Sequence, residues 1–367
     1  MALSVSLNTG LVAAALAVTG LAAAPSMAQP NLAQAVGPTV AEPSSPASAA
    51  YRFEQWELDA ADGARRYRVQ LAVPRRAAPA GGFPVLYMLD GNAAFAALTA
   101  DQLLALEREG MPPVVVAIGY ATNLRFDTTA RAYDYTPPVP GPGPTMDSGA
   151  HDRPAGGADI FLAFIEQQIK PAVRERVAID PARQSLWGHS YGGLFVLHAL
   201  LRQPASFQRY IAADPSFWWQ NGFILQEERQ AAAIAPGSCL LVMSGASAGN
   251  AGNSNNANNA NNANNANNAN SANSGNSASP ASAAAGDAPP PARAGIDSAA
   301  VQRMREARRS VPPETARLFV ARQAQRDGLH ATWREFEGAS HGAMLGLSVG
   351  PALQVASSAP GASCTLP

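Results

Sequence analysis

The stretch that most constrains the fold is S-L-W-G-H-S-Y-G-G-L-F, residues 185–195. An apolar run of strand type ends here, and an apolar run of helical type continues to about residue 202. Glycines at 188 and 192 flank a single serine, Ser190, at the point where strand turns into helix. A strand that leads directly into a helix is typical of a sheet covered by helices, so we expect an α/β fold.

The rest of the chain alternates strands and helices around this turn. Strands are expected at 83–91, 112–120, 209–214, 238–245 and 330–338, and helices at 94–109, 159–177, 191–202, 315–326 and after residue 342. Pro171 is expected to end or bend the second helix. The alternation predicts one domain over residues 51–357, with a mostly parallel sheet and helices on both faces.

Composition and charge narrow the classes of partner. Hydrophobic residues make up 47% of the 367 residues, which is enough for a sizeable core. Lys and Arg number 26 against 27 Asp and Glu, so no basic face for nucleic acid is implied.

The N-terminus has the pattern of a secretory signal. Residues 11–24 are apolar but short for a membrane span, and Ser26-Met27-Ala28 is a small-x-small cleavage pattern. We expect cleavage after Ala28, a periplasmic or secreted location and no stable membrane insertion afterwards. Residues 1–9 contain no Lys or Arg, so an uncleaved anchor or an Ala-rich tail is the alternative. Residues 29–50, rich in Pro, Ser and Ala, are expected to be a disordered linker.

A second low-complexity block lies within the domain. Residues 246–295 repeat Asn-Asn-Ala and then run through Ser, Ala and Pro, without an aliphatic face of helical or strand type. This predicts a disordered surface insert, and residues 358–367 are expected to be a tail. The two cysteines, Cys239 and Cys364, can pair in an oxidising compartment, but Cys239 also suits a core strand, so the pairing stays open.

Ser190 is the candidate nucleophile and His341 its candidate base. Gly188-His189-Ser190-Tyr191-Gly192 is a G-x-S-x-G at a strand-to-helix turn, where the serine Oγ stands above the edge of the sheet. His341 follows the last strand in a loop flanked by Ser and Gly, in the chain order that this fold requires. The chain's other histidines lie at less suitable positions, and the alternative is a turn serine with a solvent histidine.

Acyl transfer also requires donors for an oxyanion. One expected donor is the backbone N–H of Tyr191, directly after the nucleophile. The other is an N–H of the loop L-D-G-N-A-A-F, with Gly91 and Asn92 as candidates, although a plain Asp-Gly turn would give the same sequence.

Several motifs together resemble a known family. V-L-Y-M-L-D-G-N-A-A-F, the loop that includes R-A-Y-D-Y-T-P-P, G-H-S-Y-G-G-L-F, D-P-S-F-W-W and S-H-G-A-M occur in that order. They resemble the α/β-hydrolase putative esterases, most closely the enterobactin and bacillibactin trilactone esterases and their periplasmic relatives. The resemblance implies that the substrate side of the pocket includes Arg125, Arg131, Trp218 and Trp219, where cations and indoles suit an anionic aromatic ligand. For the two arginines, local salt bridges are the alternative.

The expected catalytic acid is missing from its usual place. Between Glu228 and Asp287 there is no Asp or Glu, because the Asn-rich insert occupies the loop after the strand 238–245. A Ser–His dyad, which the resemblance suggests for periplasmic members, is ranked first. Asp214, where the family has Ser before Pro-Ser, is ranked second, and Asp287 or Asp297 from beyond the insert is the third reading.

These observations predict a serine ester hydrolase that forms an acyl-enzyme. The resemblance implies catecholate trilactone siderophores as substrates, and an iron-siderophore is included as a small-molecule partner. A general carboxylesterase and a catalytically silent ligand-binding homologue are the alternatives. No metal site and no cofactor is implied by the sequence.

Overall fold

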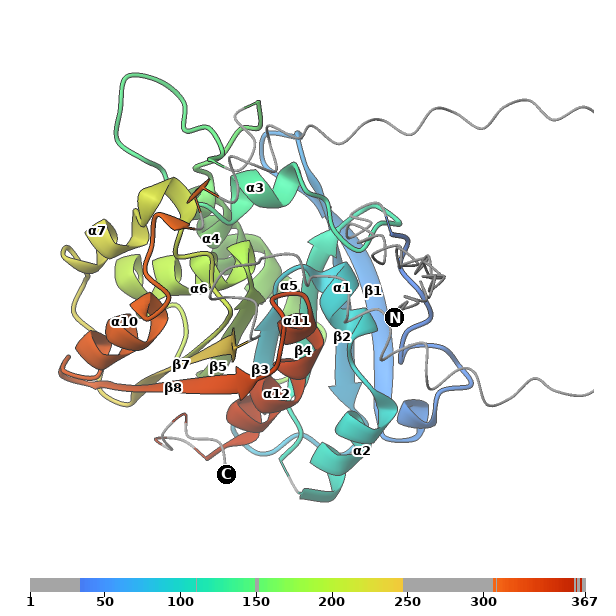
Figure 1. Ribbon diagram of the computed structural model, residues 1–367. Coiled ribbons are helices and arrows are strands. Elements are labelled where there is room, and N and C mark those ends of the chain that lie inside the picture. Colours follow the sequence, from blue (N-terminus) through green and yellow to red (C-terminus); the bar gives the residue numbers. More distant parts are fainter. Residues whose placement is uncertain are drawn as a thin grey trace, which may run out of the picture.

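The computed structural model describes residues 34–109, 111–148, 152–246, 306–307, 309–359, 361 and 364. An eight-stranded sheet in the order β1-β2-β4-β3-β5-β6-β7-β8 forms its centre (Figure 1). The strands are β1 (Tyr51–Asp59), β2 (Arg66–Pro74), β3 (Phe83–Met88), β4 (Val114–Tyr120), β5 (Ile179–His189), β6 (Arg209–Ala213), β7 (Ser238–Ala246) and β8 (Leu329–Glu337). Strands β4 to β8 and β3 pair in parallel, while β1 and β2 add an antiparallel edge. The predicted mostly parallel α/β architecture is confirmed.

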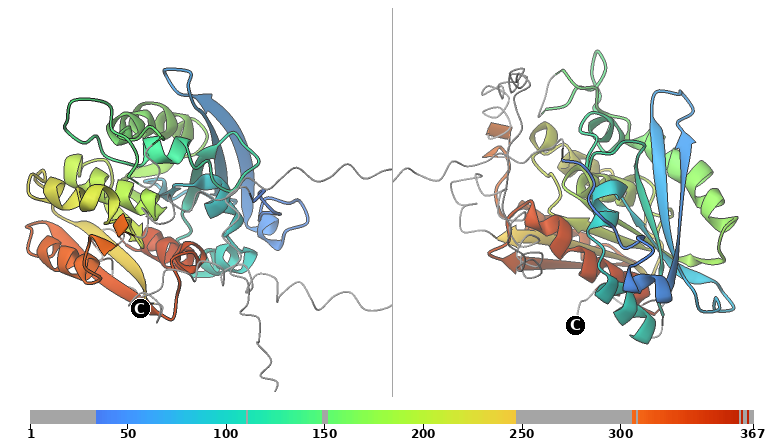
Figure 2. Two further views of the ribbon diagram at one scale, coloured as in Figure 1. Left: turned by 45° about the horizontal axis from the view of Figure 1, so that its top comes forward. Right: turned by 90° about the vertical axis from the view of Figure 1, so that its right-hand side faces the viewer.

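Helices cover both faces of the sheet (Figure 2). On one face lie α1 (Gly91–Ala96), α2 (Ala100–Glu109), α11 (Ala343–Leu347) and α12 (Val349–Ser357). On the other lie α4 (Ala158–Phe164), α6 (Tyr191–Arg202), α7 (Ile224–Glu228) and α10 (Thr315–Gln323). The connections also contain η1 (Pro46–Ala49), α3 (Ala130–Asp134), η2 (Ile165–Ile169), α5 (Lys170–Arg174) and η3 (Trp219–Asn221). Among the described residues, no helix has both the length and the apolar character needed to span a membrane.

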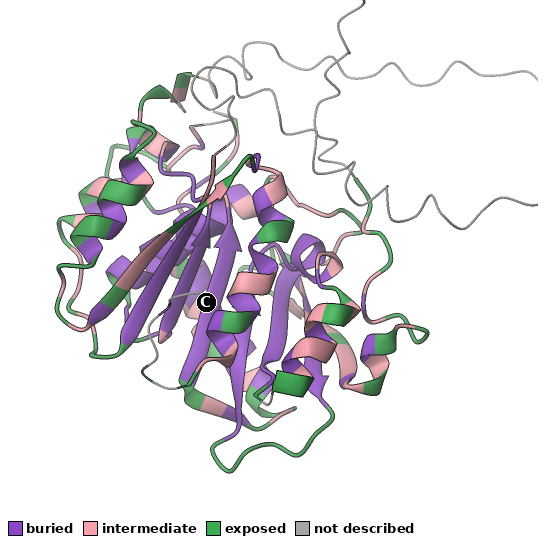
Figure 3. Ribbon diagram, turned by 60° about the horizontal axis from the view of Figure 1, so that its bottom comes forward, coloured by how far each residue is buried: buried purple, intermediate pink, exposed green. Residues whose placement is uncertain are grey.

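The central strands are buried on both faces, which explains their continuous apolar sequence (Figure 3). Side chains alternate along β3: Val85 and Tyr87 belong to the core beneath α4 and α6, whereas Leu86 and Met88 belong to the core beneath α1 and α12. The strand therefore contributes to two hydrophobic cores at once, and a polar residue at any of these positions would be buried.

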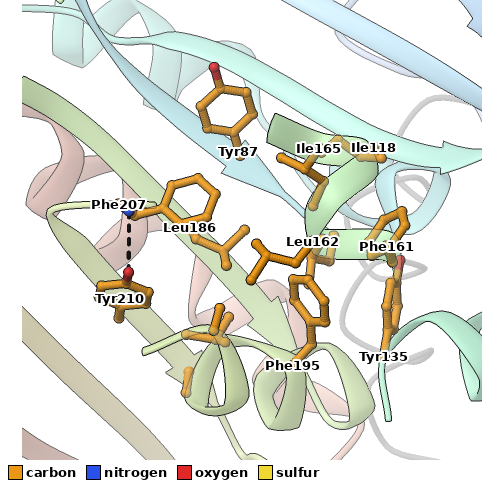
Figure 4. Packing of buried hydrophobic residues seen from close by; sticks show 14 of the residues in the cluster. Tyr87, Ile118, Tyr135, Phe161, Leu162, Ile165, Leu186, Phe195, Phe207 and Tyr210 are labelled. Atoms are coloured by element: carbon orange, nitrogen blue, oxygen red, sulfur yellow. Dashed lines mark hydrogen bonds between the residues drawn. The ribbon is translucent and has the colours of Figure 1, made fainter. Parts of the chain in front are cut away.

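Aromatic rings fill the core beneath α4 and α6. The ring of Phe161 lies 5.3 Å from that of Phe195 and 5.5 Å from that of Tyr135 (Figure 4). The Tyr135 hydroxyl leaves this core at one end and accepts a hydrogen bond of 2.9 Å from the backbone N–H of Asp90, just after β3. The aromatic core thereby supports the loop at the carboxyl end of β3.

Two expected helices are divided in the structure. The helix expected at 94–109 is two helices, α1 and α2, because Thr99 begins a second helix. Thr99 and Gln102 form a reciprocal capping box, with N–H to side-chain oxygen distances of 2.9 and 3.2 Å. The helix expected at 159–177 runs as α4, the π-helical η2 and α5. The segment η2 ends two residues before Pro171, which has no N–H to donate.

Residues 34–50 differ from the expected disordered linker. Ala35 bridges Leu124, and Val40 and Ala47 are buried against the domain. A short 3₁₀ helix, η1, is capped by the Ser45 side chain. These small apolar residues fill gaps beside α2 and β1, which composition alone did not reveal. Residues 1–33 and the expected insert from 247 onward lie outside the described residues.

Cys239 and Cys364 form a disulfide, with Cα atoms 5.6 Å apart. It fastens the C-terminal segment to the first residues of β7, and two buried arginines act beside it. Arg183 and Arg209 donate to the carbonyls of residues 357–359 at 2.7–3.2 Å, at the end of α12. The C-terminal segment, predicted to be a tail from residue 358, is therefore attached to the sheet at two described points.

We predict that removal of this disulfide destabilises the protein. The bridge closes a chain of 125 residues, so its loss should lower the free energy of unfolding by about 2–4 kcal/mol. Thermal unfolding of Cys364→Ala should occur at a lower temperature than that of the wild type. Reductant should lower the wild-type midpoint and leave the variant unchanged; equal sensitivity of both proteins would contradict the assignment.

Candidate active site

Ser190 stands at a sharp turn between β5 and α6. Its backbone has φ 62° and ψ −117°, a conformation that side chains rarely adopt, and its N–H donates to the carbonyl of Ala213 on β6 at 3.0 Å. A Cβ at Gly188 would lie 2.3 Å from the carbonyl oxygen of Gly192, so the turn requires glycine there. The glycines of the motif thus permit the close contact of strand and helix that holds the serine out.

His341 faces this serine from the loop that follows β8. Its Nε2 lies 3.1 Å from Ser190 Oγ, and its side chain is 29% exposed. Gly338 precedes it with φ 72°, and Gly342 follows it at the start of α11. This is the geometry in which an imidazole accepts the proton of an attacking serine.

Asp214 lies on the other side of the imidazole. It follows β6 directly, and its Oδ2 is 2.6 Å from His341 Nδ1. The arrangement differs from the expected Ser–His dyad and corresponds to the alternative in which Asp214 is the acid. The pairing of β6 with β5 explains it, because Ser190 and Asp214 both follow strands that end together at one edge of the sheet. Asp287 and Asp297 lie outside the described residues.

The surroundings of Asp214 keep its carboxyl ionised. Burial raises the pKa of Asp214, but the charge and hydrogen bond of His341 lower it more, and the backbone N–H of Gly245 adds to that effect. The net pKa lies below its ordinary value. An ionised carboxylate on Nδ1 holds the histidine in the tautomer whose Nε2 can accept a proton.

The loop after β3 brings backbone N–H groups to the same edge. Gly91 and Asn92 begin α1, and a Cβ at Gly192 would lie 3.7 Å from Asp90 Oδ2, so this loop adjoins the start of α6. The described residues provide no hydrogen-bond acceptor for the N–H groups of Gly91, Asn92 or Tyr191. They are therefore available as oxyanion donors.

The side chain of Asn92, unlike its backbone N–H, has a structural role. Its Nδ2 donates to the carbonyls of Tyr120, Thr122 and Leu124 at 2.9–3.1 Å, which holds the loop after β4 in place. A Cβ at residue 91 would lie 2.5 Å from the Ile118 carbonyl carbon, so α1 starts in close contact with β4.

The two arginines expected to contact substrate have partners within the protein. Arg131 forms a two-point ion pair with Asp90, at 2.9 and 2.8 Å, and its guanidinium lies 5.3 Å from the Tyr191 ring. Arg131 therefore holds the loop after β3 in place. Its side chain is only 13% exposed. Arg125 contacts Gln34 at 3.3 Å and lies above Phe126, and burial lowers its pKa.

The two tryptophans have different surroundings. Trp218 is partly exposed and packs against the Tyr191 ring at 5.8 Å, so it remains a candidate wall of the pocket. Trp219 is fully buried, and its Nε1 donates to Asp147 at 3.2 Å. The indole of Trp219 therefore packs in the core, and its surroundings do not support the predicted contact with substrate.

Asp147 is a residue that the sequence analysis missed. This fully buried carboxylate accepts hydrogen bonds from the Tyr191 hydroxyl at 2.7 Å and from Arg153 at 3.1 Å, in addition to Trp219. It joins the loop after α3 to the residue that follows Ser190. Its loop is rich in Gly and Pro and has no periodicity, so the sequence carries no signal for a buried carboxylate there.

Comparison with known proteins decides the family. The model of the family described as putative esterase matches residues 62–281. The chain belongs to this esterase family. The curated apo-salmochelin esterase of Escherichia coli O6:H1 is 46% identical over 189 residues, which cover 52% of this chain and 58% of that protein. The ferri-bacillibactin esterase BesA of Bacillus subtilis is 40% identical over 174 residues, 44% of this chain and 58% of that protein. The aligned parts thus span less than two thirds of these relatives.

Solved structures of related esterases share the fold. The enterobactin and salmochelin hydrolase IroE has a TM-score of 0.57 at 30% identity, covering 87% of this chain and 99% of that one. The siderophore hydrolase EstA from Aspergillus nidulans has a TM-score of 0.59 at 26% identity, covering 85% and 96%. The predicted α/β-hydrolase fold and the resemblance to siderophore esterases are confirmed.

We predict that Asp214→Asn lowers kcat for ester hydrolysis by up to about 10⁴-fold. The amide keeps the size of the side chain but loses the charge that orients His341. The measurement is steady-state hydrolysis of one ester, with folding checked by circular dichroism. Asp101→Asn, on the exposed first turn of α2, is the matched control and should retain full activity. A decrease in kcat of less than about tenfold in folded Asp214→Asn would instead support the Ser–His dyad.

Proposed function

We propose that this esterase hydrolyses carboxylic esters through an acyl-enzyme on Ser190. The observation that carries the proposal is the chain of contacts from Asp214 through His341 to Ser190, at 2.6 and 3.1 Å. Membership of the esterase family and relatives named as siderophore esterases support it.

The proposed hydrolysis proceeds in two steps, acylation and deacylation of Ser190. Ser190 Oγ attacks the ester carbonyl while its proton passes to His341 Nε2, and Asp214 stabilises the imidazolium. The N–H groups of Tyr191 and of Gly91 or Asn92 hold the oxyanion. The proton then goes to the leaving alcohol as the C–O bond breaks. In the second step, water gives its proton to His341 and attacks the acyl-enzyme, which releases the acid and restores Ser190.

We propose siderophore-type catecholate polyesters as the substrates. The names of the relatives support this class, and the partly exposed indole of Trp218 beside the Tyr191 ring offers an aromatic surface next to the nucleophile. The proposal includes the substrate with and without its iron, since one relative is named for an apo-siderophore and another for a ferri-siderophore. A general carboxylesterase and a silent binding protein are the competing outcomes of the test below.

We also propose that the protein is exported. The signal pattern that ends at Ala28 supports export, and the disulfide between Cys239 and Cys364 suits the oxidising conditions of the periplasm or the exterior.

The activity test compares wild type, Ser190→Ala and the exposed control Ser310→Ala. Ser190→Ala should lose about 10⁴ to 10⁶-fold in kcat and all labelling by a fluorophosphonate, because the nucleophile is gone, and Ser310→Ala should keep both. A catecholate trilactone should exceed a short nitrophenyl ester in kcat/KM by at least about tenfold. Equal turnover of both esters would identify a general carboxylesterase. A wild type that neither turns over nor labels would identify a binding protein.

The export proposal predicts a mature N-terminus at Gln29. The mass of the protein recovered from the periplasm or the medium of an expressing bacterium should correspond to residues 29–367, because the signal is removed on export. Recovery of the full chain from the cytoplasm alone would contradict the proposal.

A further inference from the structure

His189, the residue directly before the nucleophile, contacts the candidate base. Its Nε2 lies 2.8 Å from the backbone carbonyl oxygen of His341, and the two imidazole rings pack with centroids 4.7 Å apart. The side chain is 6% exposed. None of the catalytic steps described above uses this histidine.

The contact defines the protonation of His189. A carbonyl oxygen can only accept, so Nε2 carries the hydrogen and donates it. Burial is the main cause that lowers the pKa of His189, the charge of His341 lowers it further and the charge of Asp214 opposes this, so that the pKa is about 3. His189 is therefore a neutral donor at neutral pH and does not compete with His341 for the proton of Ser190.

The backbone of His341 needs such a fixed point. Gly338 and Gly342 lie on either side of the histidine, and glycine restricts the backbone less than any other residue. Asp214 holds the ring at Nδ1, but a ring and a carboxylate do not by themselves fix the main chain that carries the ring. The bond from His189 attaches that main chain to β5, the same strand that carries Ser190.

We propose that His189 is a positioning residue that sets the distance between His341 Nε2 and Ser190 Oγ by holding the carbonyl of His341. The proposal rests on the proposed function. Because nucleophile and anchor are consecutive residues, any movement of β5 displaces serine and base together and leaves their separation unchanged. A small misplacement of a catalytic group can cost about 10²-fold in rate, so the anchor should act on kcat.

The test compares two substitutions in the full-length chain. His189→Phe keeps an aromatic ring and removes the donor, whereas His189→Gln places an amide N–H close to the position of Nε2. We expect His189→Phe to lower kcat by about 10 to 100-fold with KM within about threefold, and to slow fluorophosphonate labelling in parallel. His189→Gln should recover kcat to within about fivefold of wild type. His330→Phe, on the exposed start of β8, is the matched control and should be unchanged.

Defined outcomes would overturn the proposal. A folded His189→Phe with wild-type kcat, or a His189→Gln as slow as His189→Phe, would show that the donated hydrogen bond has no role in positioning. A rise in KM at unchanged kcat would assign the residue to substrate binding. If His189→Phe does not fold, nitrogen NMR of the wild type decides: the account requires the hydrogen on Nε2 of His189 at neutral pH, and its presence on Nδ1 alone would refute it.

The proposal and the proposed function fail in different ways. An inactive wild type that does not label at Ser190 would remove the esterase function itself. An active wild type with an equally active His189→Phe would remove only the anchor.

Discussion

The backbone is held in the left-handed region at the ends of three adjacent parallel strands. Asp90 after β3, Ser190 after β5 and Asp214 after β6 have φ values of 50°, 62° and 45°. Each such residue costs on the order of 1–3 kcal/mol unless its side chain tolerates the conformation, as Asp does better than Ser. The three residues persist there because hydrogen bonds to Tyr135, Ala213 and Met243 hold their N–H groups. The site depends on this constraint, since these turns direct the oxyanion donors, the nucleophile and the acid to the carboxyl end of the sheet.

Hydrogen bonds from neighbouring residues hold the side chains at these turns in fixed positions. Arg131 holds Asp90 by two hydrogen bonds, and Asp147 accepts a hydrogen bond from the Tyr191 hydroxyl. His341 reaches the site from the far edge of the sheet, after β8, and so requires anchors of its own. Asp214 provides one at the ring, and His189 provides the other at the main chain. Residues that follow the parallel strands thus position His341, the catalytic residue that comes from the loop after β8.

The sequence predicted the parts of this site that are encoded locally. The strand-to-helix turn at Ser190 and the loop histidine after the last strand have short-range signals, and both lie where they were expected. The sequence offered Asp214 only as the second candidate for the acid, because its role depends on the pairing of β6 beside β5 and on the path of a loop that begins after β8. Likewise, nothing in two adjacent tryptophans tells which one enters the core. The strands β1 and β2 were missed, although the alternating exposure of β1 is typical of an edge strand.

The central claim is that the carboxyl ends of the parallel strands present an activated Ser190 opposite preformed oxyanion donors. The most direct measurement is a crystal structure of the protein inactivated with diisopropyl fluorophosphate, whose phosphoryl oxygen stands in for the oxyanion. The account predicts phosphorus bonded to Ser190 Oγ and that oxygen within about 2.7–3.1 Å of the backbone nitrogen of Tyr191 and of Gly91 or Asn92. Phosphorus on another residue, or a phosphoryl oxygen directed away from these nitrogens, would contradict it.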